Sequence, residues 1–275
     1  MVNADDMGLT AGVCRAVRRG HDEGVVTSTS VLAVGSAFDE AAATVRDAGS
    51  LALGAHLAIV GEDRPLLSAA EVPTLVDREG RFPLSYRTVV ARGATGRLDP
   101  ADVAREFGAQ LERVRGIGVP VTHLDTHQHT HLWPAVAGVV VDLAREAGIA
   151  AVRLPGSARR GPLGAGVRLL AGRLRRGLGR SGLATTDGYA GLDEAGRMDD
   201  VRFAGALQRL TATGAGTAEI NVHPGEAGDP ELARFDWGGY RWAEELAMLT
   251  SPTTRALVES SGWRLGTFAD VAGNR

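Results

Sequence analysis

The chain has 275 residues, enough for one large domain or two small ones around a buried core. Apolar residues make up 44% of it and charged residues 23%, which excludes extensive disorder, and the net charge of −3 argues against a nucleic-acid-binding protein. The single cysteine, Cys14, excludes an intrachain disulfide and indicates a reducing compartment, so we expect a cytoplasmic protein. No apolar run approaches the ~20 residues of a membrane span.

Short apolar runs alternate with longer segments of helical spacing along the whole chain. The runs typical of strands are 25–34, 51–56, 120–124, 149–154, 218–222 and 263–268. Helical spacing or helix-start signals mark 38–45, 100–114, 136–147, 201–210, 240–249 and 252–261. Ser36 and Asp99 are the expected N-caps of the first two helices.

This alternation predicts an α/β protein with a mostly parallel sheet. About seven strands favour a single-domain, irregular β/α barrel over residues 1–275, closed or nearly closed. An open doubly wound sheet is the competing architecture, but no glycine-rich phosphate loop follows a strand.

Two segments interrupt the alternation and are predicted to be long loop excursions, 58–98 and 156–198. Residues 156–184 contain seven arginines and no acidic residue. A solvated helix or a mobile excursion explains this composition, and a rim that meets an anionic substrate or surface is the alternative.

Polar residues that can bind metals stand where the apolar runs stop. They are Asp5, Asp6, His56, His123, Asp125, His127 and His223, with Arg153 at a comparable position. In a β/α barrel the carboxyl ends of the strands share one face, and active sites are built there. We therefore expect these residues, which are distant in sequence, to converge.

Residues 123–131 (HLDTHQHTH) give the strongest signal of a metal site. Four histidines and one aspartate occur at strict alternation, so in an extended chain they would share one face. Neutral imidazole is a common ligand of zinc and related metals, and histidines that are not ligands can hold the ligands by hydrogen bonds. Asp5 and Asp6 would point in opposite directions in a strand, unless a bend turns both toward one site; a helix-capping turn is the alternative.

These motifs together resemble the YdjC-like carbohydrate deacetylase family, which includes chitooligosaccharide deacetylases and deacetylases of hopanoid biosynthesis. The matching segments, in the family's order, are 3–8 (NADDMG), 24–30 (GVVTSTS), 54–57 (GAHL), 122–131 (THLDTHQHTH), 152–155 (VRLP), 185–187 (TTD) and 222–225 (VHPG). Only Met1 and Val2 precede the first motif, so either the first strand is very short or the natural start lies upstream.

The resemblance implies a barrel-like fold, often homodimeric, that removes acetyl groups from N-acetylated sugars with one divalent metal ion, zinc or magnesium. By motif position the metal ligands would be Asp6, His56 and His127, the catalytic base Asp5 and the acid His223. His123, Asp125, His129 and Arg153 would bind substrate or support the ligands. The metal would activate a water that attacks the acetyl carbonyl, Asp5 would take its proton, and His223 would protonate the leaving amine.

Two alternatives remain open at this stage. A second metal held by Asp125, His129 and His131 would favour hydrolysis of another bond, such as a phosphoester. A non-catalytic sugar-binding protein could use the same scaffold, although binding alone requires neither base nor acid.

Overall fold

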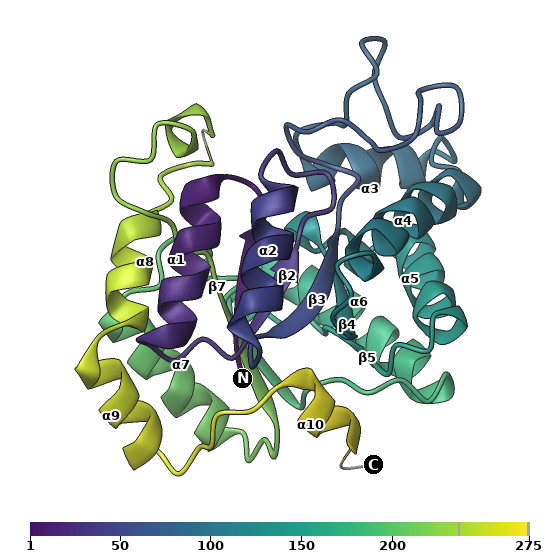
Figure 1. Cartoon of the computed structure of the whole chain (residues 1–275). Helices are drawn as coiled ribbons and strands as arrows, with labels where there is room; N and C mark the ends of the chain where they lie inside the picture. The colour runs from purple at the N-terminus through teal and green to yellow at the C-terminus, as the bar shows by residue number, and fades with distance from the viewer. Residues whose placement is uncertain (236, 274–275) are drawn as a thin grey trace.

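A seven-stranded parallel sheet forms the centre of the computed structural model, which describes residues 1–235 and 237–273 (Figure 1). Its strands are β1 (Val2–Met7), β2 (Ser28–Val31), β3 (Ala52–Leu57), β4 (Val121–Thr126), β5 (Ala151–Val152), β6 (Gly188–Ala190) and β7 (Ala218–Val222). Their order in the sheet is β5-β4-β3-β2-β1-β7-β6. The first strand therefore lies near the middle of the sheet and includes the Asn-Ala-Asp-Asp motif itself.

The sheet curls until its two edges share one segment of chain. Ala184 forms a parallel bridge with Ala151 at the β5 edge, and four residues later β6 pairs with β7 at the other edge. This confirms the nearly closed β/α barrel and excludes the open doubly wound sheet.

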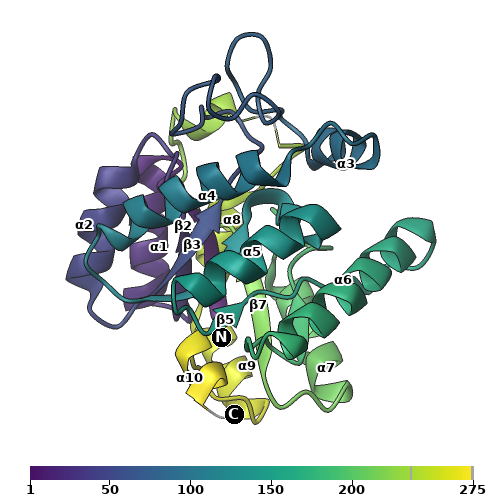
Figure 2. The same cartoon turned by 90° about the vertical axis from the view of Figure 1, so that its right-hand side faces the viewer.

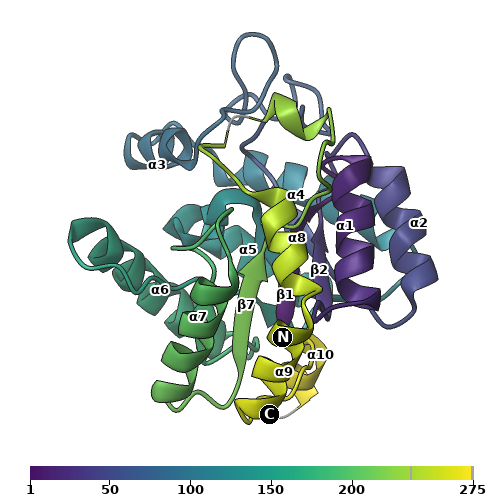
Figure 3. The ribbon, with the colours of Figure 1, turned by 90° about the vertical axis from the view of Figure 1, so that its left-hand side faces the viewer.

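Helices surround the barrel on its outer face (Figures 1, 2 and 3). They are α1 (Ala11–Asp22), α2 (Phe38–Ala48), α3 (Tyr86–Ala94), α4 (Pro100–Arg115), α5 (Pro134–Glu146), α6 (Pro162–Arg180), α7 (Asp200–Ala212), α8 (Trp242–Leu249), α9 (Pro252–Ser260) and α10 (Phe268–Gly273), with 3₁₀ turns η1 (His127–Leu132) and η2 (Leu232–Arg234). None of the helices in the described residues is long and apolar enough to cross a bilayer.

Local signals placed most of these elements correctly. Asp99 caps α4 through its side chain, with Pro100 in the first turn, as predicted. The expectation for Ser36 was wrong: Ala37 precedes α2 without a side-chain cap, and the Ser36 hydroxyl donates to the Leu9 carbonyl instead.

One further expectation was wrong, and both expected excursions contain regular structure. Residues 263–268 do not form a strand; α10 begins at Phe268 and packs against β4 and β5. The excursion 58–98 contains α3. The excursion 156–198 contains the 19-residue helix α6, in agreement with the solvated helix expected for its arginine-rich part, and the strand β6, whose three residues are too few to show a strand pattern.

Gly54 in β3 lies against a buried histidine, and this contact allows a prediction. A Cβ at Gly54 would lie 2.2 Å from the ring of His123, which stacks on Phe268 and cannot move away. We expect Gly54→Ala to lower the free energy of unfolding by about 1–3 kcal/mol, the usual effect of overpacking a core. Chemical denaturation measures it. Gly108→Ala is the control: its Cβ would contact nothing within 4 Å in α4, so a loss of similar size there would contradict the steric explanation.

Candidate active site

A cavity of about 380 Å³ opens at the carboxyl ends of the strands. Residues from several distant parts of the chain line it: Asp5, Asp6, His56, Leu84, Ser85, Tyr86, His127, Gln128, His129, Leu192, Ala195, His223, Trp237 and Tyr240. The barrel therefore brings together Asp5, Asp6, His56, His127 and His223, as their positions at strand ends predicted, and adds His129 from the segment that follows β4.

The end of β1 directs both aspartates into this cavity. Asp6 has a φ of 61°, a left-handed conformation that is uncommon for residues other than glycine. The pairing of β1 with β2 shifts register between Ala4 and Met7. This irregularity is the bend that lets two consecutive side chains, which a regular strand would send to opposite faces, reach one site.

Asp6, His56 and His127 form a compact group of potential metal ligands. His56 Nε2 lies 3.2 Å and His127 Nδ1 lies 2.9 Å from the same carboxylate oxygen, Asp6 Oδ1. All three side chains are buried. Burial by itself would raise the pKa of Asp6, but His127 and His56 hold that pKa well below its usual range.

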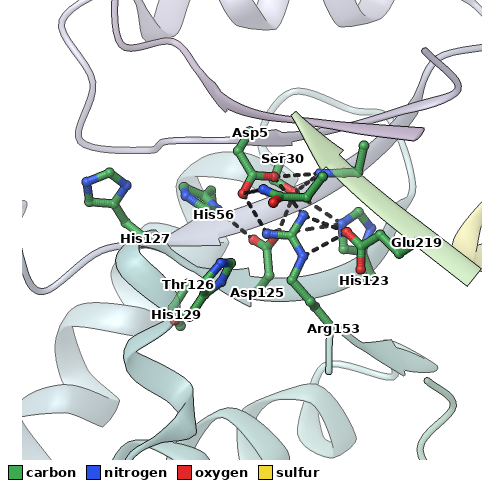
Figure 4. Close-up of polar contacts among 12 residues, drawn as sticks. Asp5, Ser30, His56, His123, Asp125, Thr126, His127, His129, Arg153 and Glu219 are labelled. Carbon is green, nitrogen blue, oxygen red and sulfur yellow. Dashed lines mark hydrogen bonds and ion pairs between the residues drawn. The ribbon is translucent and has the colours of Figure 1, made fainter. Parts of the chain in front are cut away.

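Asp125 orients His56 from the side opposite to Asp6. His56 Nδ1 lies 2.8 Å from Asp125 Oδ1, so His56 donates there (Figure 4). This contact leaves Nε2 turned toward Asp6. Although burial lowers the pKa of His56, the Asp125 and Asp5 carboxylates raise it to about 10. A carboxylate behind a histidine is the usual arrangement that fixes the tautomer of a metal-binding imidazole.

Asp5 lies beside this group and accepts four hydrogen bonds. Arg153 reaches both of its oxygens, at 2.6 and 2.7 Å. Asn221 donates to Oδ2 at 2.6 Å and Asn3 to Oδ1 at 2.8 Å. These donors, two on each oxygen, fix the orientation of the carboxylate, and Asp5 also lines the cavity.

Arg153 is fully buried and connects three carboxylates (Figure 4). Besides Asp5, it contacts Asp125 at 2.6 Å and Glu219 at 2.7 Å. Burial raises the pKa of Glu219 to about 7, although Arg153 opposes this shift. Sequence reasoning had named Arg153 and Asp125 but missed Glu219, for which an acidic residue inside the apolar run 218–222 was the available signal.

The alternation of residues 123–131 does not persist as an extended chain. Strand β4 ends at Thr126, and Gln128 and His129 have left-handed φ values of 51° and 53°. His127 and His129 thus enter the cavity, whereas His123 and His131 are buried beside it.

The hydrogen bonds of His123 and His131 define supporting roles. His123 Nε2 lies 3.1 Å from the Ser30 hydroxyl, and burial lowers the pKa of His123 to about 4. His131 has both ring nitrogens engaged, Nδ1 with Thr126 Oγ1 and Nε2 with the Arg153 carbonyl. His131 is therefore poorly placed to hold the second metal that the phosphoesterase alternative requires.

The opposite wall of the cavity comes from the C-terminal third of the chain. His223 is buried, and its Nδ1 has no hydrogen-bond partner among the described residues. Tyr240 lies edge-on to its ring, with centroids 5.3 Å apart, and Trp237 lies 5.2 Å from the His127 ring. Sequence reasoning missed both aromatic residues: Trp237 lies outside every predicted element, and Tyr240 was assigned to the helix 240–249, which begins only at Trp242.

A family model described as YdjC-like protein matches residues 1–260. This chain belongs to the YdjC-like family. The match extends from the β1 motif through His223, so it contains every residue discussed above except the C-terminal helix α10.

Named relatives and one solved structure agree with this assignment. A chitooligosaccharide deacetylase of Klebsiella pneumoniae is 32% identical, with 98% of each chain covered. A carbohydrate deacetylase of Geobacillus stearothermophilus is 33% identical over 98% of this chain and 96% of its own, and one of Homo sapiens is 33% identical over 100% and 91%. A crystal structure from Enterococcus faecalis, described as a candidate cellobiose-phosphate cleavage protein, superposes with a TM-score of 0.82 at 25% identity and covers 99% of this chain and 98% of its own.

Proposed function

We propose that this chain is a metal-dependent hydrolase that removes the acetyl group from an N-acetylated sugar. One observation carries the proposal: three potential ligands, Asp6, His56 and His127, converge in a cavity next to a carboxylate fixed by Arg153. The names of the relatives support a sugar as the substrate.

The residues fit a single divalent ion, which we take to be zinc or magnesium. Asp6, His56 and His127 offer one oxygen and two nitrogen atoms within 4.8 Å of one another, and Asp125 holds His56 in position. Histidine ligands favour a transition metal, whereas availability in the cell can favour magnesium. A bound ion would supply Lewis-acid polarisation of the acetyl carbonyl and of a water molecule.

Asp5 is the proposed general base. It lines the cavity beside the ligand group without being one of the three ligands, and its four donors hold it in one orientation. There it would accept a proton from the attacking water as the water oxygen bonds to the acetyl carbon. Arg153, Asn221 and Asn3 position Asp5 and do not themselves touch the substrate.

His223 is the proposed acid. Cleavage of the amide C–N bond leaves an amine that needs a proton, and an imidazole donates protons readily near neutral pH. The His223 ring faces the same cavity as Asp5, and the Glu245 carboxylate accepts a hydrogen bond from its backbone N–H at 2.6 Å. Acetate and the free amino sugar are the products.

Two aromatic residues and His129 complete the proposed sugar site. Trp237 and Tyr240 line the cavity and offer flat apolar surfaces against which a sugar ring can stack. His129 lines the same cavity, with Nε2 3.2 Å from the Tyr189 hydroxyl. The family relationship leads us to propose a homodimer, and the single cysteine leads us to propose a cytoplasmic location; sedimentation and fractionation would test these two proposals.

The proposal predicts that acetate release depends on one metal ion per chain. Chelation should abolish release from N-acetylated mono- and oligosaccharides, and zinc or magnesium should restore it. His127→Ala should lose the ion together with activity, whereas His129→Ala should still bind one ion. Acetate assays and metal analysis measure both. Two ions per chain with phosphatase activity would favour the phosphoesterase alternative, and metal-bound protein that binds sugars without releasing acetate would favour a sugar-binding protein.

A further inference from the structure

A second cavity of about 420 Å³ continues directly from the candidate active site. The two cavities share four lining residues, Tyr86, Gln128, His129 and Leu192. Helices α3 and α6 form its walls and project from the same side of the barrel (Figures 2 and 3). We call this cavity the α3–α6 groove.

The surface of the α3–α6 groove is apolar along most of its length. Val89 and Val90 line it from α3, Leu163, Val167 and Leu170 from α6, and Trp133 from the segment between η1 and α5. Leu163 remains 58% exposed, a large exposed fraction for a leucine that lines a cavity. An apolar surface of this kind gains free energy when an apolar ligand displaces water from it.

Polar groups that line the groove already bond to one another. The Ser157 hydroxyl donates to Asp193 Oδ1 at 2.8 Å, and Arg159 donates to the Asp193 carbonyl and pairs with its carboxylate. Most of the polar atoms of Ser157 and Asp193 are therefore already engaged, which leaves few of them for sugar hydroxyls. Additional sugar units would lose their hydration there with few replacements, so the groove is unsuited to a long oligosaccharide.

The wall between the two cavities is held in place by specific contacts. The Gln128 side chain donates to the Leu84 carbonyl and accepts from the Tyr86 N–H, which fixes the start of α3 against the site. Gly93 of α3 lies so close to the Trp133 indole that a Cβ would be 2.1 Å away. Helix α3 is therefore fixed against the segment 128–133, next to His127 and including His129.

We propose that the substrate is an N-acetylated sugar with an apolar substituent, which lies in the α3–α6 groove while the acetyl group lies at Asp6, His56 and His127. This inference rests on the proposed function and adds the class of substrate. The continuity of the groove with the catalytic cavity favours part of the substrate as its occupant over a second copy of the chain. The sugar ring would occupy the shared region beside Tyr86 and His129.

The test compares N-acetylglucosamine carrying a methyl or an octyl group at its anomeric carbon. We expect the octyl glycoside to have a KM about tenfold lower or better, because several methylene groups leave water. Equal KM values, or a clear preference for diacetylchitobiose over the octyl glycoside, would overturn the proposal. Failure to release acetate from every compound would instead reject the proposed function. In that case calorimetric binding of the octyl but not the methyl glycoside still tests the groove.

Two neighbouring leucines of α6 provide a matched pair of variants. Leu170 lines the groove, whereas Leu169 is 71% exposed and does not line it. Leu170→Asp should remove the advantage of the octyl glycoside and leave kinetics with the methyl glycoside unchanged, while Leu169→Asp should change neither. Equal effects of the two variants would contradict the assignment. If sedimentation shows that both variants dissociate a dimer, the groove is an interface between copies and the proposal is wrong.

Discussion

Asp5→Asn is expected to lower kcat for acetate release by about 10²–10⁴-fold, the usual contribution of a positioned general base. The amide has no carboxylate lone pair with which to accept the proton of the attacking water. The ion should remain bound, since the proposed ligands are Asp6, His56 and His127. KM should change much less than kcat, because a missing proton acceptor affects the transition state more than substrate binding.

Two comparisons distinguish loss of the base from loss of metal and from misfolding. Asp6→Asn is the matched variant: the same substitution one residue later should lose metal as well as activity. Because the neutral amide of Asp5→Asn would leave the Arg153 guanidinium without one of its counter-charges, melting temperatures should accompany the kinetics. Full activity of Asp5→Asn with metal bound would show that another group is the base.

Arg153→Met is expected to cause the largest loss of stability, about 3–5 kcal/mol in the free energy of unfolding, the typical cost of breaking a buried ion pair by removing one partner. The substitution keeps much of the side-chain volume but leaves Asp5, Asp125 and Glu219 buried without their shared cation. Arg153→Lys should lose less stability, because it keeps the charge but cannot contact Asp5 through two nitrogens.

Chemical denaturation measures these losses, and Arg159→Met provides the control. Arg159 also pairs with a carboxylate, Asp193, but its side chain is 57% exposed, so its loss should cost at most about 1 kcal/mol. Arg153→Lys should also lower kcat with metal retained, because Asp5 loses its fixed orientation. Similar stability losses at positions 153 and 159 would contradict the account of the buried network.

Local patterns in the sequence were sufficient for much of the fold. The apolar runs at 51–56, 120–124 and 218–222 identify β3, β4 and β7 to within two residues, because buried strands need continuous apolar sequence. Helix α4 followed from Asp99 and Pro100, whose capping chemistry acts within one turn. By contrast, 263–268 resembles a strand only through three apolar residues, Trp263, Leu265 and Phe268. In the structure, its last residue begins α10, which packs against β4 and β5.

The candidate site was also predicted only in part from the sequence. The residue types at the strand ends indicated that Asp6, His56 and His127 would meet, because parallel strands deliver their carboxyl ends to one face. The sequence could not show that Asp6, Gln128 and His129 adopt left-handed conformations, since nothing in their side chains requires this. Those conformations separate the ligands from the supporting histidines.

The sequence by itself thus determined the family, the α/β class and which chemical groups the site contains, because composition, periodicity and motif spacing are local properties. Only the tertiary structure decided which group performs which role. Arg153 lies next to an apolar run like many surface arginines, yet closure of the barrel buries it between carboxylates from β1, β4 and β7. The α3–α6 groove likewise arises from two helices far apart in the sequence. Their apolar residues form one groove only because the fold places the two helices on the same cavity.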